Sequence, residues 1–308
     1  MKIVFAGTPE FAVPSLKALV EAKFEIAAVL TQPDRPKGRK GILTPSPVKE
    51  TALALGIPVL QPTKLKEDFS SLKAVGADLM VTCAYGQILT QEVLDLFPAG
   101  VWNVHASLLP AYRGAAPIAR AIMAGETQTG ITIMKTDIGL DTGDIFLSQK
   151  AEIPPLDTCD ALTGRLALVG AKLIVEAIHK IQAGQVVLKK QGDGFVCKKV
   201  SRTQVDFFKS AEEVACLIRG LSSSPLAYGT INGLTLNFYN AQAEAYEGDE
   251  ESGTVLCAEP KAGLLIKCVK GAVRILSLQP AGGKVMSGKE FCNGRKLTKG
   301  QRFDKPVL

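Results

Sequence analysis

Short apolar runs alternate with longer segments of helical periodicity through the first half of the chain. The apolar runs cover residues 2–6, 24–31, 57–61, 77–84 and 101–105. The segments with apolar positions three and four residues apart cover residues 11–22, 48–55, 65–75 and 91–96. Regular alternation of strand and helix is typical of a mostly parallel sheet with helices on both faces. We therefore predict a Rossmann-like α/β domain.

Two more strand-like runs, at residues 131–137 and 144–152, precede a long predicted helix over residues 160–182. One apolar stripe runs along this helix, and His179 lies beside the stripe near the C-terminal end. A histidine at the end of a helix is compatible with the helix dipole. We therefore predict a structural rather than a catalytic role for His179.

The pattern changes after Gly184. Residues 185–209 are polar and lysine-rich, which is typical of a linker, and residues 211–219 form a predicted short helix. Apolar runs then follow at 228–231, 234–241, 253–257, 264–269 and 273–279, separated by turn residues. Many short strands predict a small C-terminal β-barrel of the OB-fold type. The expected domains are residues 1–184, a linker at 185–209, and residues 210–308.

The composition is that of a globular protein, with 46% apolar and 21% charged residues. No apolar run reaches the length of a membrane span, and the first residues indicate a buried strand rather than a signal peptide. The seven cysteines are scattered and form no C-x-x-C pair. This predicts reduced thiols, a cytoplasmic location and no metal site.

Charge is distributed unevenly along the chain. Residues 1–184 carry 18 Lys and Arg against 18 Asp and Glu, whereas residues 185–308 carry 18 against 12. The whole net charge of +6 therefore lies in the last two-fifths. Such an excess fits a solvated, lysine-rich surface, and it also fits a module that binds a polyanion. Charge alone favours the first interpretation.

A long loop at residues 31–47 contains four prolines and the basic residues Lys37, Arg39 and Lys40. A connection of this length inside an α/β domain is usually functional or disordered. A surface loop without a function is the alternative interpretation.

Residues Gly7-Thr8-Pro9-Glu10 follow the first strand, where a nucleotide-binding motif would lie. Neither G-x-G-x-x-G nor G-x-x-x-x-G-K-[ST] is present, so nicotinamide and ATP chemistry gain no support. We expect a plain turn in which Thr8 caps the next helix and Pro9 takes its first position.

His105, one of two histidines in the chain, ends the predicted strand 101–105. Asn103 and His105 project from the same face of that strand, at the edge where open α/β sheets bind ligands. An amide beside an imidazole can polarise a carbonyl and move a proton. A buried polar pair satisfied by backbone groups is an equally open interpretation.

Two acidic residues, Asp141 and Asp144, lie in the glycine-containing turn at residues 139–144. A carboxylate in this turn could orient an imidazole, as the third member of a catalytic set does. Taken alone, the segment is an ordinary acidic turn, and spacing in the sequence does not show that Asp141 meets His105.

Seven motifs link the chain to a known family. They are K-I-V-F-A-G-T-P-E-F at 2–11, T-Q-P-D-R-P-K-G-R at 31–39, P-S-P-V-K at 45–49, A-Y-G-Q-I-L at 84–89, N-V-H-A-S-L-L-P-A-Y-R-G-A-A-P-I at 103–118, G-L-D-T-G-D at 139–144 and L-S-L-Q-P-A-G at 276–282. On these motifs the chain resembles the methionyl-tRNA formyltransferases, within the formyltetrahydrofolate-dependent formyltransferase family, nearly end to end.

The resemblance implies a reaction and its partners. A formyl group would pass from 10-formyltetrahydrofolate, the co-substrate, to the amino group of methionine on initiator methionyl-tRNA, giving formylmethionyl-tRNA for translation initiation. No metal and no membrane are involved in such a reaction, and a monomer is expected.

The resemblance also assigns residues. Asn103 would hold the formyl oxygen, His105 would act as general acid and base, and Asp141 would hold His105 and help to remove a proton from the attacking ammonium. The expected folate site consists of Ser107, Leu108, Leu109, Pro110, Tyr85, Gly86, Gln87, Ile88 and Leu89. The expected tRNA contacts are Lys37, Arg39 and Lys40 of the loop, and the basic residues Lys189, Lys190, Lys198, Lys199 and Arg202 extend the tRNA-binding surface of the C-terminal domain.

The sequence departs from the family pattern at three places. Ala106 stands where glycine is common, Phe207 stands where tryptophan is usual, and residues 219–225 replace a stretch that is usually richer in aromatic residues and proline. These differences concern the linker and the packing of the C-terminal domain rather than the catalytic assignment.

Two other functions remain at this point. A formyltransferase acting on glycinamide ribonucleotide or an amino sugar nucleotide would share the Asn–His pair, but it would not need a basic second domain. A folate- or RNA-binding protein without catalysis is the alternative from another class, and the presence of Asn103, His105 and Asp141 argues against it.

Overall fold

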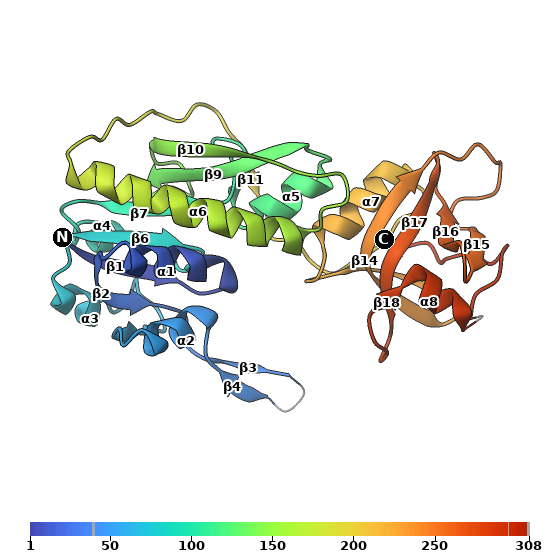
Figure 1. Ribbon diagram of the computed structural model, residues 1–308, viewed down its shortest axis with the longest axis horizontal. Coiled ribbons are helices and arrows are strands. Elements are labelled where there is room, and N and C mark those ends of the chain that lie inside the picture. Colours follow the sequence, from blue (N-terminus) through green and yellow to red (C-terminus); the bar gives the residue numbers. More distant parts are fainter. Residues whose placement is uncertain (39–40, 295, 307–308) are drawn as a thin grey trace. The chain divides into compact units, whose positions relative to one another are not determined.

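The computed structural model describes residues 1–38, 41–294 and 296–306 (Figure 1). By their internal contacts these residues form two compact units. The first unit comprises Met1–Gly114, Gly130–Ala151 and Thr163–Val196. The second comprises Ala115–Thr129, Glu152–Leu162 and the chain from Cys197 onward.

The first unit is built on a seven-stranded sheet with the strand order β10-β9-β7-β6-β1-β2-β5. The strands are β1 (Lys2–Gly7), β2 (Glu25–Leu30), β5 (Val59–Leu60), β6 (Leu79–Cys83), β7 (Val101–His105), β9 (Gln128–Lys135) and β10 (Ile145–Glu152). The pairs from β7 through β6, β1 and β2 to β5 are parallel, whereas β9 pairs antiparallel with β7. The prediction of a mostly parallel, Rossmann-like sheet is confirmed.

Both faces of this sheet are covered. Along β1, Ile3 and Phe5 point to one face and Val4 and Ala6 to the other, yet all four are fully buried. Burial on both faces is what makes the strands of a parallel sheet continuously apolar. It also explains why the sequence shows uninterrupted apolar runs here rather than alternation.

The helices of the first unit follow the predicted segments closely. They are α1 (Val13–Glu21), α2 (Pro47–Ala54), α3 (Ser70–Val75), α4 (Gln91–Leu94) and α6 (Cys159–Gln182), and Figure 1 shows α6 lying along the sheet. Leu72 of α3 and Val93 of α4 share a buried cluster with Val4 and Ala6. The exposed ring of His179, in the last turn of α6, packs 4.9 Å from the ring of Phe24.

The expectation for Thr8 and Pro9 is wrong. A short 3-10 helix, Glu10–Ala12, comes between β1 and α1, and no side-chain cap is present at either helix start. The Thr8 hydroxyl instead donates to the carbonyl oxygen of Tyr85 at 2.9 Å. Because the neighbouring strand end offers Thr8 this acceptor, its side chain is not available to cap a helix.

The long loop contains a small hairpin that the sequence did not predict. Its strands are β3 (Arg35–Lys37) and β4 (Ile42–Thr44). The side chains of Ile42 and Leu43 are about two-thirds exposed, at 63% and 66%. Arg39 and Lys40 lie outside the described residues, as does the side chain of Lys37, so the structure describes none of the three expected tRNA-contacting side chains of this loop.

The second unit contains a sheet with the order β12-β13-β14-β17-β16-β15, and β18 pairs with β17. The elements are β12 (Thr203–Gln204), β13 (Ala227–Ile231), β14 (Leu234–Glu244), β15 (Val255–Glu259), β16 (Gly263–Lys267), β17 (Ala272–Pro280), β18 (Met286–Ser287), α5 (Pro117–Met123), α7 (Ala211–Gly220) and α8 (Gly288–Asn293). Helices α5 and α8 and the short strands β8 (Arg113–Gly114), which belongs to the first unit, β11 (Val196–Cys197) and β12 were not predicted.

The end of the chain closes this sheet into a ring. The Phe303 amide donates to the Gly253 carbonyl at 2.9 Å, next to β15. The Asp304 amide donates to the Thr230 carbonyl of β13 at 2.8 Å. The terminal segment therefore joins the β15 side of the sheet to β13 by backbone hydrogen bonds, as in a small, partly open barrel.

Three phenylalanines fill the core of the ring. Phe207 lies 5.1 Å from Phe303 and 6.4 Å from Phe238, measured between ring centroids. A Cβ on Gly229 would lie within 3.0 Å of ring atoms of Phe238 and Phe303, so glycine is needed on β13 for the rings to fit. Phe207, the residue found where tryptophan is usual, is thus a core residue of the second unit.

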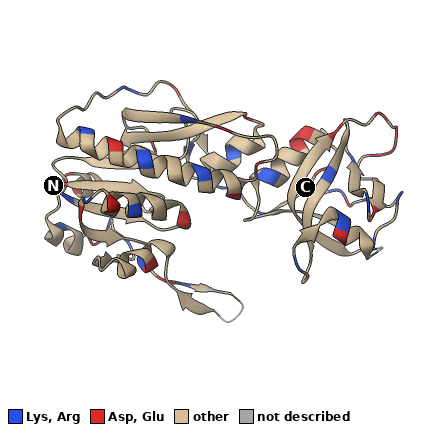
Figure 2. Ribbon diagram, in the orientation of Figure 1, with Lys and Arg blue, Asp and Glu red and all other residues tan. Residues whose placement is uncertain are grey.

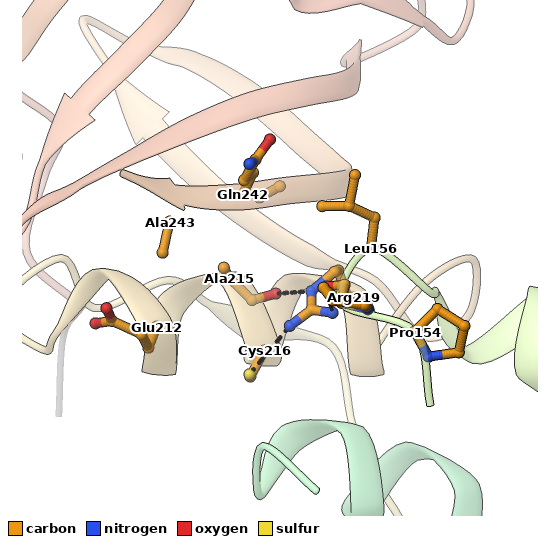
Figure 3. Close-up of a pocket in the computed structure, with 10 residues that line it drawn as sticks. Pro154, Leu156, Glu212, Ala215, Cys216, Arg219, Gln242 and Ala243 are labelled. Carbon is orange, nitrogen blue, oxygen red and sulfur yellow. Dashed lines mark hydrogen bonds between the residues drawn. The ribbon is translucent and has the colours of Figure 1, made fainter. Parts of the chain in front are cut away.

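A surface groove of about 610 Å³ also belongs to the second unit (Figure 3). Residues from the 154–156 segment, α7 and β14 line it. Arg219 lies along the groove, with its guanidinium donating to the carbonyls of Ala215 and Pro155 and to Cys216 Sγ. The lining includes none of the residues expected to act in catalysis.

None of the seven cysteines forms a disulfide, and five of them are buried. Burial raises the pKa of Cys83 to about 12, which leaves this thiol protonated and unreactive. Within the described part of the chain, no helix has both the length and the apolar character needed to cross a membrane.

Candidate active site

Asn103 lies on β7 with its side-chain amide held from two sides. Its Oδ1 accepts a hydrogen bond of 3.0 Å from Thr82 Oγ1, and its Nδ2 donates to Asp141 Oδ1 at 3.3 Å. Thr82 stands beside Asn103 because β6 and β7 are parallel and pair these two residues. Since the hydroxyl donates to the amide oxygen, the NH₂ group is the end that faces Asp141.

The turn that carries Asp141 has a specific backbone. Asp141 itself has φ of +53°, in the left-handed region that most residues avoid. A Cβ on Gly143 would overlap the carbonyl oxygen of Lys135, so only glycine fits there. The glycine at position 143 therefore has a steric cause: it allows the turn to approach the backbone at the end of β9.

Asp141 contacts both of the β7 side chains. Its Oδ2 lies 3.6 Å from His105 Nδ1 and accepts the Gly114 amide at 2.8 Å. Its Oδ1 faces the Asn103 amide. The structure therefore brings together Asn103, His105 and Asp141, although Asp141 is distant from the other two in sequence.

His105 is buried, with 5% of its surface exposed. Its Nε2 lies 3.0 Å from the carbonyl oxygen of Tyr112. A carbonyl oxygen only accepts, so we assign a hydrogen to Nε2 and leave Nδ1 facing the Asp141 carboxylate. The carboxylate thus lies against the ring nitrogen that can take up or release a proton.

These three side chains form a set suited to transfer of an acyl-type group. An oriented N–H donor stabilises negative charge on an oxygen, an imidazole moves protons, and a carboxylate orients the imidazole. Asn103 and His105 lie toward the C-terminal end of the parallel strand β7, where open α/β sheets bind ligands, and the Asp141 turn between β9 and β10 contacts them there. The described residues contain no group of three or more His, Cys, Asp or Glu placed to hold a metal ion.

The segment 107–110 is fixed by hydrogen bonds to β9. Ser107 is fully buried; its Oγ donates to the Ala111 carbonyl at 2.7 Å and its own carbonyl accepts from Thr132 Oγ1 at 2.7 Å. The Leu109 amide in turn donates to Thr132 Oγ1 at 3.1 Å. This segment follows His105 directly, so its fixed backbone forms one wall beside the catalytic set.

The segment 84–89 is more exposed than the segment 107–110. Gly86 and Ile88 are exposed, and 78% of Ile88 is accessible. Gln87 anchors the segment by donating to the Pro62 carbonyl and accepting from the Leu65 amide. Leu89 is half-buried.

Tyr85 points into the core beneath this segment. Burial raises the pKa of its hydroxyl, and its oxygen has no hydrogen-bond partner among the described residues. This orphaned polar atom lies among apolar side chains that include Val93 and Phe97. A bound ligand or a water molecule would satisfy it.

The basic side chains expected to contact tRNA differ in whether they already have partners within the protein. Lys189, Lys190, Lys198 and Lys199 are exposed. Arg202 instead lies over the Tyr228 ring at 4.0 Å and donates to Asn237 Oδ1 at 2.8 Å. The lysines are therefore free to meet an anion, whereas Arg202 is held on the surface of the barrel.

The sequence analysis missed Thr82 as a member of this site. Its signal was present, because Thr82 lies in the predicted strand 77–84 and parallel pairing places that strand beside residues 101–105. Arg113 and Gln191 were also missed. Gln191 contacts the backbone of the Asp141 turn, and Arg113 contacts Gln191. Neither the spacing nor the periodicity of the sequence connects these two residues with Asp141.

Family comparison gives matches to both parts of the chain. Residues 1–178 match the family described as formyl transferase, and residues 198–296 match the formyl transferase C-terminal domain. A methionyl-tRNA formyltransferase of Chromobacterium violaceum is 46% identical over 98% of this chain and 99% of its own length. One from Janthinobacterium sp. is 44% identical over 96% of this chain and 98% of its own.

Solved structures show the same fold at lower identity. WlaRD, a sugar 3N-formyl transferase crystallised in the presence of dTDP and 5-N-formyl-THF, superposes with a TM-score of 0.65. It is 21% identical, and the match covers 89% of this chain and 97% of WlaRD.

Proposed function

The chain belongs to the formyltransferase family, among the methionyl-tRNA formyltransferases, and on this premise we propose how its residues carry out the reaction. The enzyme transfers a formyl group from 10-formyltetrahydrofolate to the amino group of methionyl-tRNA. The acceptor proposed is the initiator tRNA, and the product is formylmethionyl-tRNA for translation initiation.

Asn103 is proposed to hold the formyl oxygen. Thr82 fixes its amide so that the NH₂ group faces the catalytic set, 3.3 Å from Asp141. When the methionine nitrogen attacks the formyl carbon, negative charge develops on the formyl oxygen. An N–H donor already in position stabilises that charge without reorganisation.

His105 and Asp141 are proposed to handle the protons. A new C–N bond to methionine forms, and the bond from the formyl carbon to N10 of the folate breaks. The methionine ammonium loses two protons in all, of which one reaches N10 and the other leaves to solvent. His105, buried and held by Tyr112 and Asp141, gives and accepts protons at Nδ1. Asp141 orients the ring and helps to remove the proton from the ammonium through water.

The folate co-substrate is proposed to bind along residues 107–110 and 84–89. The residues fit a largely apolar ring system, because the exposed Ile88 side chain offers an apolar contact surface. The Tyr85 hydroxyl, buried beneath this segment without a partner in the described structure, is a polar group for a ligand or water to satisfy. Ser107, Leu108, Leu109 and Pro110 would form the wall nearest His105, and Gly86, Gln87 and Leu89 would complete the edge.

The proposed division of the chain assigns residues 1–184 to catalysis, 185–209 to a linker and 210–308 to tRNA binding. The basic residues of the linker and the loop residues Lys37, Arg39 and Lys40 would contact tRNA. A monomer in the cytoplasm fits this assignment. Arg39→Leu is expected to raise the KM for tRNA with folate binding unchanged, because leucine removes the guanidinium that clamps phosphates or base edges.

The observation that carries this function is the contact of Asp141 with both Asn103 and His105. It is tested by incubating the full chain with 10-formyltetrahydrofolate and methionylated initiator tRNA, with mass spectrometry of the product. Glycinamide ribonucleotide and an amino sugar nucleotide serve as competing acceptors in parallel reactions. Formylation of either small acceptor in preference to the tRNA would contradict the proposed acceptor.

A further inference from the structure

The turn that carries Asp141 is held by a side chain from a distant part of the chain. Gln191 lies in the segment that follows α6, and its Nε2 donates to two carbonyl oxygens of the turn. The distances are 3.0 Å to Asp141 O and 2.6 Å to Gly143 O. One amide group therefore satisfies the backbone on both sides of the turn residue Thr142.

Arg113 fixes the orientation of Gln191. Its Nε and Nη2 donate to Gln191 Oε1 at 3.0 and 2.9 Å, and Nη2 also donates to the Gly192 carbonyl at 3.0 Å. A guanidinium only donates, so the oxygen of the amide must face Arg113 and the NH₂ group must face the turn. This leaves a single arrangement of the Gln191 side chain.

The same stretch of chain also holds Asp141 by its side chain. The amide of Gly114, next to Arg113, donates to Asp141 Oδ2 at 2.8 Å. Asp141 is therefore fixed twice, by its carbonyl through Gln191 and by its carboxylate through Gly114. Its left-handed backbone needs such support, because a non-glycine residue in that region persists only where its surroundings hold it.

We propose that Gln191 is a positioning residue for formyl transfer, which acts by holding the Asp141 turn so that the carboxylate faces His105. The proposal rests on the role of Asp141 proposed above. Arg113 acts through Gln191 by fixing its amide. The chemical requirement is geometric: a misplacement of about 1 Å in a catalytic group can lower the rate about 100-fold.

The key variant is Gln191→Glu. A glutamate keeps the size of the side chain and its contact with Arg113, but its carboxylate cannot donate to the carbonyls of Asp141 and Gly143. We expect kcat to fall about 10- to 100-fold, with the KM values for folate and tRNA changed by no more than about threefold. Gln191→Met removes the same donor without adding charge, and Gln185→Ala is the exposed control from the same segment.

A double-mutant cycle with Asp141→Asn separates positioning from general support of the fold. If Gln191 acts through Asp141, then Gln191→Glu lowers kcat much less in the Asp141→Asn background than in the wild type. Thermal melts of each variant check that the fold is intact. The pH profile of kcat should also shift in Gln191→Met, because the carboxylate then no longer sits in its place beside the imidazole.

Two results would overturn the proposal. One is a full, additive loss from Gln191→Glu in the Asp141→Asn background, and the other is a loss confined to the KM for tRNA in both Gln191 variants. Failure of the proposed function gives a different result, because Asp141→Asn alone would then leave kcat near the wild-type value.

Discussion

Residues 1–184 and residues 185–308 differ in net charge and in the kind of functional group that they carry. Residues 1–184 carry equal numbers of basic and acidic residues, and they contain the contacting set of Asn103, His105 and Asp141. Residues 185–308 carry the net charge of +6. In Figure 2, basic and acidic positions are both present along α6 and on the later part of the chain, so the excess of positive charge is a matter of numbers rather than of one continuous patch in this view.

The difference indicates how catalysis and substrate binding can be assigned to different residues when the substrate is a large polyanion. Catalysis needs a few polar groups held in precise positions in a site that excludes water, because a small displacement of a catalytic group lowers the rate. Holding a phosphate backbone needs positive charge spread over a rigid surface, where each contact contributes modestly and is screened by salt. Changes in the hydrogen-bonded surroundings of Asp141 should therefore alter kcat, and changes of exposed basic residues should alter affinity and its salt dependence.

The largest expected effect is loss of turnover at β7. His105→Ala should lower kcat by about 10²–10⁴-fold through loss of proton transfer, and Asn103→Ala should cost on the order of 3 kcal/mol through loss of the oxyanion donor. Binding of tRNA should be nearly unchanged in both variants. Single-turnover formylation and filter binding measure the two quantities, and half of the wild-type turnover in either variant would show that the site is wrongly assigned.

The choice of carboxylate gives the next test. Asp141→Asn should lower kcat about 100-fold, since the group that orients His105 is lost, whereas Asp144→Asn should change it little. The two residues lie in the same turn and the same substitution is made, so Asp144 is a matched control. Equal losses, or a larger loss at Asp144, would contradict the assignment.

A smaller effect is expected from Thr82→Val. The variant keeps the shape of the side chain but removes the donor that orients the Asn103 amide, so we expect about a tenfold loss in kcat from an unpaired and less ordered amide. Thr136→Val is the control, because the Thr136 hydroxyl is buried with no partner in the described residues. Steady-state kinetics of the two variants should differ; the same kcat in both would remove Thr82 from the site.

The smallest effect should appear in the basic region. Replacing Lys198 and Lys199 together with alanine should weaken tRNA binding modestly and reduce the slope of log affinity against log salt by about one for each lost phosphate contact. The double variant Lys73→Ala, Lys172→Ala removes the same charge from exposed positions in the first half. If both pairs changed the salt slope equally, the division between the two regions would not hold.

Much of the fold could be predicted because local patterns were strong. The strand 101–105 agrees with β7 at both ends, and the apolar stripe of residues 160–182 agrees closely with α6. The hairpin of β3 and β4 was missed because each strand has three residues and no alternation to detect. Helix α5 was missed because its seven residues are too few to establish a period.

The longer strands, the main helices, the family and the pair of side chains on β7 follow from local patterns, because each depends on residues that are close in the chain. Which distant groups meet that pair depends on tertiary packing. Thr82 reaches Asn103 through strand pairing, and Gln191 reaches the Asp141 turn from 50 residues away. Such contacts follow from packing of whole elements, where the free energy of many buried side chains sets the position of a few polar ones.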